Sequence, residues 1–150
     1  MNKNGFTLVE LLAVIALIAI LSGLAVTNVI SSINNSKKNA FLMDAKRMVS
    51  KAEYLISMKK NDRQQASSSG KIYIFADLNE KDEFQKDADD GNFDSNSFVK
   101  VTKSGTSFNY CVCVIGSKRK ITNGTNCNST SGAGCVSSAS LTGIDIVKDK

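Results

Sequence analysis

An apolar run near the N-terminus constrains this chain more than any other feature. From Leu11 to Ser36 there is no ionisable side chain, and at a rise of ~1.5 Å per residue a helix over this run reaches ~39 Å. That length exceeds the ~30 Å hydrocarbon core of a bilayer. Glu10 lies at the start of the run, where a carboxylate is costly unless it is neutralised or paired. The run is therefore predicted to be a membrane helix, with Glu10 facing a cationic or hydrogen-bonding partner.

A short polar leader precedes this helix. Residues 1–5, MNKNG, contain one positive charge and end in glycine, as a processing site does. A secretory signal peptide also combines a basic start with an apolar core, but its cleavage site follows the core, and Glu10 would interrupt that core. A plain membrane anchor explains the apolar run and leaves the leader and Glu10 unexplained. A lipoprotein anchor would need a cysteine close to the run, and the sequence has none there.

The string GFTLVE, from Gly5 to Glu10, resembles the prepilin signature of type IV pilins and pseudopilins. The resemblance implies that a prepilin peptidase cuts after Gly5 and methylates the new terminal amine of Phe6. It also implies that Glu10, five residues into the mature chain, pairs with the Phe6 amine of a neighbouring subunit during assembly. The chain departs from the family at Thr27, where many members carry a proline, so a proline kink is excluded.

Helical periodicity continues beyond the apolar run. Apolar residues up to Ile56 recur mostly at spacings of three, four and seven, so one helix is predicted to extend to about Lys60. The polar residues between Asn61 and Gly70 are expected to end it. The resemblance implies an α+β fold of the type IV pilin kind, in which a long N-terminal helix, membrane-spanning in its first half, packs on a small antiparallel sheet.

The expected organisation has three parts. Residues 1–5 form the leader, residues 6–36 the transmembrane and assembly half of the helix, and residues 37–150 the globular head. Alternating apolar residues and turn signals predict an antiparallel sheet of three to five strands in the head. The strands are expected at 71–75, 98–102, 107–115, 118–122 and 142–147, and a short helical piece is expected at 78–86.

All four cysteines, Cys111, Cys113, Cys127 and Cys135, lie in the C-terminal part, and an exported location makes disulfides the default. Cys111 and Cys113 would share one face of a strand with their Cα atoms ~6.6 Å apart, near the upper limit for a bridge. Each is therefore expected to pair with Cys127 or Cys135. Zinc binding is the competing interpretation, which the cysteine spacing and the lack of histidine disfavour. The family commonly closes a C-terminal loop with one disulfide, so two would be an elaboration.

Composition argues against catalysis. The sequence contains no histidine, which removes the commonest general base and the usual partner of a serine or cysteine nucleophile. We therefore predict no enzymatic activity, no catalytic residue and no cofactor. The formal net charge of +5 is too small to define a partner by itself.

Two charged segments suggest ligands. Residues 87–94 place carboxylates and an amide at nearly alternate positions, as calcium ligands require, but the glycine lies one place early for an EF-hand loop, and a solvated acidic loop is the preferred interpretation. No metal site is therefore assigned. Residues 118–120, Lys-Arg-Lys, would attract DNA or anionic surfaces if many exposed copies were repeated along a filament.

Together these observations predict a structural subunit, major or minor, of a type IV pilus serving adhesion, motility or DNA uptake. The subunit is expected to reside in the cell membrane before assembly and in an extracellular pilus afterwards. Its expected partners are the prepilin peptidase, identical or related pilin subunits, the pilus assembly platform and the membrane, with DNA only weakly supported. The alternatives are a pseudopilin of a type II secretion system, a competence pilin and, from a different class, a simple membrane-anchored binding domain.

Overall fold

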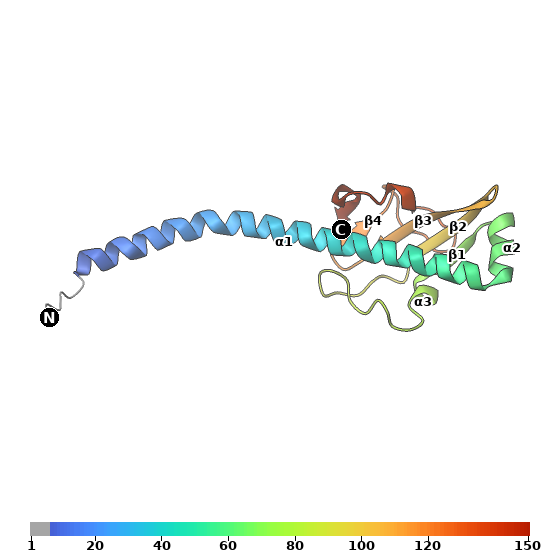
Figure 1. Cartoon of the computed structure of the whole chain (residues 1–150), viewed down its shortest axis with the longest axis horizontal. Coiled ribbons are helices and arrows are strands. Elements are labelled where there is room, and N and C mark those ends of the chain that lie inside the picture. The colour runs from blue at the N-terminus through green and yellow to red at the C-terminus, as the bar shows by residue number, and fades with distance from the viewer. Residues whose placement is uncertain (1–6) are drawn as a thin grey trace. The chain divides into compact units, whose positions relative to one another are not determined.

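The computed structural model describes residues 7–150, apart from the side chains of residues 24–27. The chain divides into two compact units, one ending at Ser36 and one comprising Lys37–Lys150. A single helix, α1 (Leu8–Met58), contributes to both units (Figure 1). The predicted long N-terminal helix is therefore confirmed, whereas the proposed cleavage site at Gly5 and Phe6 lies outside the described residues.

The second unit contains an antiparallel sheet of six strands in the described part of the chain. The strand order is β1-β2-β3-β4-β6, and β5 pairs with β3 beside β4. The β2–β3 hairpin is paired from Phe98↔Cys113 to Ser104↔Ser107 and turns at Gly105, whose φ of 61° suits glycine. The strands are β1 (Lys71–Ile74), β2 (Phe98–Ser104), β3 (Ser107–Ile115), β4 (Arg119–Ile121), β5 (Val136–Ser137) and β6 (Val147–Asp149).

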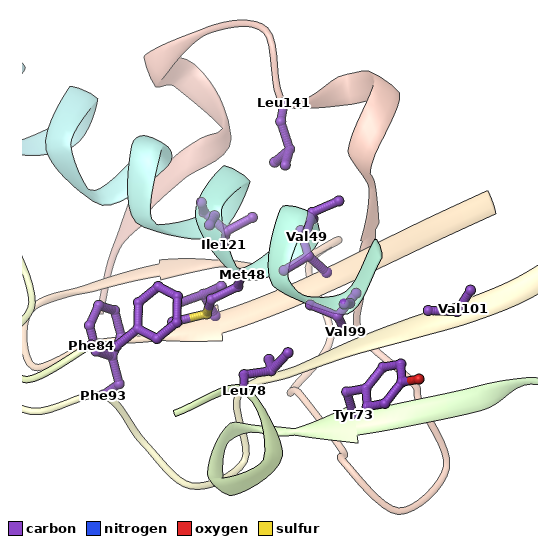
Figure 2. Close-up of a cluster of buried hydrophobic side chains, with 14 of the residues drawn as sticks. Met48, Val49, Tyr73, Leu78, Phe84, Phe93, Val99, Val101, Ile121 and Leu141 are labelled. Carbon is purple, nitrogen blue, oxygen red and sulfur yellow. The ribbon is translucent and has the colours of Figure 1, made fainter. Parts of the chain in front are cut away.

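The core forms where the second part of α1 packs on this sheet. Phe41, Ala45, Met48 and Ala52 recur at helical spacing and are all 0% exposed. They join a cluster with β-branched residues of the strands, and Figure 2 shows Met48 and Val49 of α1 beside Val99 and Ile121. The predicted α+β fold, a long helix on a small antiparallel sheet, is confirmed. The strand residues of this cluster are Tyr73, Val99, Val101, Val112, Val114, Ile121 and Val147.

The polar segment that follows α1 is a second helix. The backbone leaves helical geometry at Lys59, close to the expected helix end near Lys60, and re-enters it in α2 (Lys60–Ser68), a second helix that the sequence did not predict. Ala66 is buried in the core, and the Tyr73 hydroxyl donates a 2.9 Å hydrogen bond to Asp62. Gly70 follows with a φ of 84°, as at many helix ends. Burial of one small residue and one buried hydrogen bond therefore anchor a helix whose composition is otherwise that of a loop.

The segment between β1 and β2 also differs from expectation. A single turn, α3 (Phe75–Leu78), replaces the helical piece expected at 78–86, and the chain then continues without regular structure to Ser97. Phe84 and Phe93 hold this loop to the core through aromatic contacts, including one of 5.9 Å between the ring centroids of Phe41 and Phe93. Aromatic burial, rather than helix periodicity, therefore fixes this loop.

The C-terminal strand is shifted from the predicted range. Residues Ile144–Ile146 form a short 3₁₀ turn, η2, and the strand β6 begins only at Val147. Val147 is buried and pairs with Ile121 of β4. Pairing of Val147 with Ile121 therefore sets the register of this strand. The alternation of Ile144 and Ile146 in the sequence did not indicate this register.

Two disulfides tie the C-terminal loops to β3. Cys111 pairs with Cys135 and Cys113 with Cys127, with Cα separations of 5.4 and 5.8 Å. Both separations lie in the usual range for a disulfide. Of the pairings that the sequence left open, the structure has one, in which Cys111 and Cys113 of β3 reach two positions of the same segment between β4 and β5.

Removing the disulfide that closes the shorter loop, Cys113–Cys127, is expected to destabilise the head. The double variant Cys113→Ala with Cys127→Ala should lower the free energy of unfolding by about 3 kcal/mol, because a bridge over about 15 residues restricts the unfolded chain by that amount. Urea unfolding of the full chain in detergent, followed by near-UV circular dichroism, measures the change. A loss under about 1 kcal/mol would show that the loop is already restricted without the bridge.

Candidate functional site

The first part of α1 exposes apolar side chains around its whole circumference. Leu8, Leu12, Ile15 and Leu21 are all more than half exposed, and every residue from Thr7 to Gly23 is exposed. The helix is long and apolar enough to cross a membrane. A surface of this kind is stable only against lipid or against other apolar helices.

The N-terminus of α1 is closed by a reciprocal cap between Thr7 and Glu10. The Glu10 Oε2 atom accepts hydrogen bonds from the Thr7 N–H at 2.9 Å and from the Thr7 hydroxyl at 3.0 Å. The Glu10 N–H in turn donates to Thr7 Oγ1 at 3.3 Å. This is a capping box, which satisfies backbone donors that the helix cannot pair. The Thr-x-x-Glu spacing of a capping box is visible in the sequence, whereas the family resemblance implied only a partner for Glu10 in a neighbouring subunit.

Polar side chains within the apolar segment bond to their own helix. The hydroxyl of Ser22 donates to the Ile18 carbonyl at 2.7 Å, and that of Ser36 donates to the Ser32 carbonyl at 2.9 Å. Such bonds let hydroxyls enter an apolar environment without losing their partners. Between residues 7 and 36, Glu10 is the side chain that carries a charge, and a charge in an apolar environment needs a partner of opposite sign.

In the head, Asp89 joins three elements through ion pairs. Its carboxylate lies 2.7 Å from Arg119 Nε on β4 and 3.3 Å from Lys37 Nζ on α1. Arg119 also reaches Asp149 on β6 at 3.4 Å. The side chains of Asp89 and Arg119 are only 4% and 7% exposed. This network, which we call the Asp89 cluster (Lys37, Asp89, Arg119 and Asp149), fastens the irregular loop to the helix and to the end of the sheet.

Asp87 organises the same loop through backbone donors. Its Oδ1 atom accepts from the N–H groups of Asp89 and Gly91, both at 2.9 Å, and its Oδ2 atom accepts from the Ser117 N–H. Gly116 permits this approach, because a Cβ there would lie 2.6 Å from Asp87 Oδ2. Burial alone would raise the pKa of Asp87, but these donors hold it below its ordinary value.

These contacts reassign both charged segments that the sequence singled out. Asp87 and Asp89 direct their carboxylates to N–H groups and to the cations Lys37 and Arg119, so they are already occupied by the protein itself. No group of three or more candidate metal ligands occurs in the described residues. In the basic triplet 118–120, the middle residue Arg119 is buried in the Asp89 cluster, so the three cations do not form one exposed patch.

The Asp89 cluster is expected to make the head acid-sensitive. Burial raises the pKa of Asp89, but Arg119 and Lys37 outweigh burial and lower it below the ordinary value of 3.8. A depressed pKa contributes stability that is complete above the ordinary pKa and is lost as the pH falls through the folded-state pKa. The pKa of Asp87 is also lowered, so Asp87 likewise loses its contribution to stability in acid. Burial raises the pKa of Asp44, so protonation of Asp44 has the opposite effect on stability.

The melting temperature of the full chain should therefore change little from pH 7 to about pH 5 and fall below about pH 4. Thermal unfolding in detergent at a series of pH values measures this profile. The variant Asp89→Asn should fall less steeply below pH 4 than the unmodified chain. Equal slopes would remove Asp89 as a source of the acid response.

Comparison with known proteins identifies the N-terminal segment. Residues 1–26 match the family model described as the prokaryotic N-terminal methylation motif. Neither the curated proteins nor the solved structures gave a match to the chain. The matched range contains the polar leader, the Thr7–Glu10 cap and most of the exposed apolar helix.

Proposed function

We propose that this chain, whose methylation motif supports a type IV pilin-like or pseudopilin protein, is a structural subunit of a type IV pilus. The observation that carries the proposal is the coincidence of the methylation motif at residues 1–26 with a helix whose apolar surface is exposed on every side. Such a signal implies processing by prepilin peptidase and assembly with other pilin subunits. The role is structural, since the motif belongs to pilin-type structural proteins.

The apolar half of α1 supplies the driving force in this proposal. Before assembly it spans the membrane, which suits its length and composition. On assembly the same surface moves from lipid into a bundle of helices from neighbouring subunits. Loss of lipid contact is then offset by close helix packing. Contacts between unlike faces of identical heads repeat without closing, and a fibre results.

Glu10 sets the axial position of each subunit. Cleavage after Gly5 would create a positively charged amine at Phe6, and its pairing with Glu10 of a neighbour would leave neither charge unpaired in the apolar bundle. The cap engages only one oxygen, Oε2, among the described residues. An ionised carboxylate accepts several hydrogen bonds, so it can cap its own helix and still receive an external amine.

Intact-mass analysis and N-terminal sequencing test the proposal. The chain should be recovered from native membranes and from sheared extracellular material of the same cells. We expect a mature chain that starts at Phe6, carries one added methyl group and is abundant in the sheared fraction. An unprocessed Met1 start in a cell that contains a prepilin peptidase would reject the filament proposal and leave a membrane-anchored binding domain.

The fraction that contains the mature chain separates the remaining alternatives. A methylated chain confined to the membrane would favour a minor pilin or a pseudopilin of a secretion system over a major pilin. The commitment of Asp87 and Asp89 to internal partners removes the calcium loop as an argument for the pseudopilin.

A further inference from the structure

A pocket of about 470 Å³ lies on the C-terminal side of the head, between the outer strands and the loop of residues 122–126. Lys120 of β4 and Lys148 of β6 line it together with Asn123 and Asn126 of the loop. Its apolar lining includes Val136 and Ile146, which are half-buried. This volume falls within the range of pockets that hold small ligands.

We call this the Lys120–Lys148 pocket. Its two lysines lie directly opposite each other on neighbouring strands. Lys120 pairs with Lys148 in the register of β4 and β6, so their side chains share one face of the sheet. Like charges in this position repel each other. Within residues 7–150, neither ammonium group has a carboxylate within ion-pair distance, although Lys120 is half-buried. The pocket thus concentrates positive charge that the described protein does not neutralise.

The wall of the pocket is held in place by covalent and hydrogen bonds. The disulfide from Cys113 to Cys127 closes the loop, and the Asn123 N–H donates to the Gly134 carbonyl at 3.1 Å. The Thr122 hydroxyl donates to Gly134 at 2.8 Å. No acceptor among the described residues is bonded to the side-chain NH₂ of Asn123 or Asn126. A pre-formed wall with free amide donors binds a ligand without the entropic cost of ordering a loop.

We propose that the Lys120–Lys148 pocket binds an acidic saccharide. A ring carboxylate placed between the two ammonium groups would relieve their repulsion. The free amides of Asn123 and Asn126 match sugar hydroxyls, and the apolar surface of Val136 and Ile146 matches the C–H face of a sugar ring. The combination of charge, amides and an apolar surface favours a carboxylated sugar over a bare phosphate, which would leave the apolar surface of Val136 and Ile146 uncovered.

Binding of trigalacturonate to the full-length, unassembled chain in nonionic detergent tests the proposal. Calorimetry gives the affinity, and NMR shifts of the Lys120 and Lys148 amides locate the site. Maltotriose, a neutral trisaccharide, and a hexathymidylate oligonucleotide are the comparison probes. We expect trigalacturonate to bind and the double variant Lys120→Gln with Lys148→Gln to bind it about tenfold more weakly, the effect of two partly screened ion pairs.

A matched control comes from a second basic hollow, lined by Lys60, Arg63 and Lys103. Lys60→Gln with Arg63→Gln removes the same charge and should leave trigalacturonate affinity within about twofold. Without ligand, Lys148→Gln should also raise the melting temperature, because it removes a like-charge pair. Absence of binding, equal loss in both double variants, or equal affinity for the oligonucleotide would overturn the proposal. Since neither cleavage nor assembly enters this test, its result is independent of the proposed pilus function.

Discussion

Replacing Asp89 with alanine is expected to lower the free energy of unfolding by about 3 to 5 kcal/mol, the usual cost of removing one partner of a buried ion pair. Arg119 would remain with only 7% of its side chain exposed and with Asp149 at 3.4 Å. Lys37 would lose its partner too, but it is 38% exposed and can turn to water. Urea unfolding of the full chain in detergent, followed by near-UV circular dichroism, measures the loss.

Two further variants show whether breaking the ion pair between Asp89 and Arg119 causes this loss. Glu80→Ala removes an exposed carboxylate from the same irregular loop and should change stability by less than about 0.5 kcal/mol. The double variant Asp89→Leu with Arg119→Met removes both charges and should be more stable than Asp89→Ala, because the buried guanidinium is removed together with its Asp89 partner. A double variant as unstable as the single one would show that Asp89 stabilises the loop by packing alone.

The sequence revealed those elements whose signal is local and repeated. The apolar run and the spacing that continues to Ile56 predicted α1 to within a few residues of its end at Met58. Alternating residues on either side of Gly105 predicted the β2–β3 hairpin. In the second part of α1 the helical spacing of the apolar residues coincides with the residues that are buried on the sheet.

Elements fixed by distant partners escaped the same reasoning. α2 depends on burial of Ala66 in the core and on the hydrogen bond from Tyr73 to Asp62. Neither contact gives a signal in the polar sequence of the helix. The irregular loop before β2 follows Phe84 and Phe93 into the aromatic cluster, at a spacing with no helical or strand period. Tertiary contacts outweigh local propensity at both places.

The candidate site divides in the same way. The N-terminal signal is contiguous, so residues 1–26 could be assigned from sequence alone. The Asp89 cluster joins residues 37, 89, 119 and 149, and nothing in the sequence places a carboxylate of an acidic run beside one arginine of a basic triplet. The acidic segment was interpreted as a solvated loop because the cations that neutralise Asp89 lie far away along the chain.

Glu10 has two separable roles, and two substitutions distinguish them. Glu10→Ala removes both the cap on Thr7 and the charge, whereas Glu10→Gln retains an amide oxygen that can accept from the Thr7 N–H. If pairing with the Phe6 amine of a neighbour sets the axial position, both variants should yield mature, membrane-resident chains whose sheared filament yield falls at least about tenfold. Thr7→Val is the control, since it removes the capping hydroxyl and leaves the carboxylate, and it should assemble at near-normal yield. Normal filament yield from Glu10→Gln would instead assign Glu10 to capping its own helix, because the charge would then be dispensable.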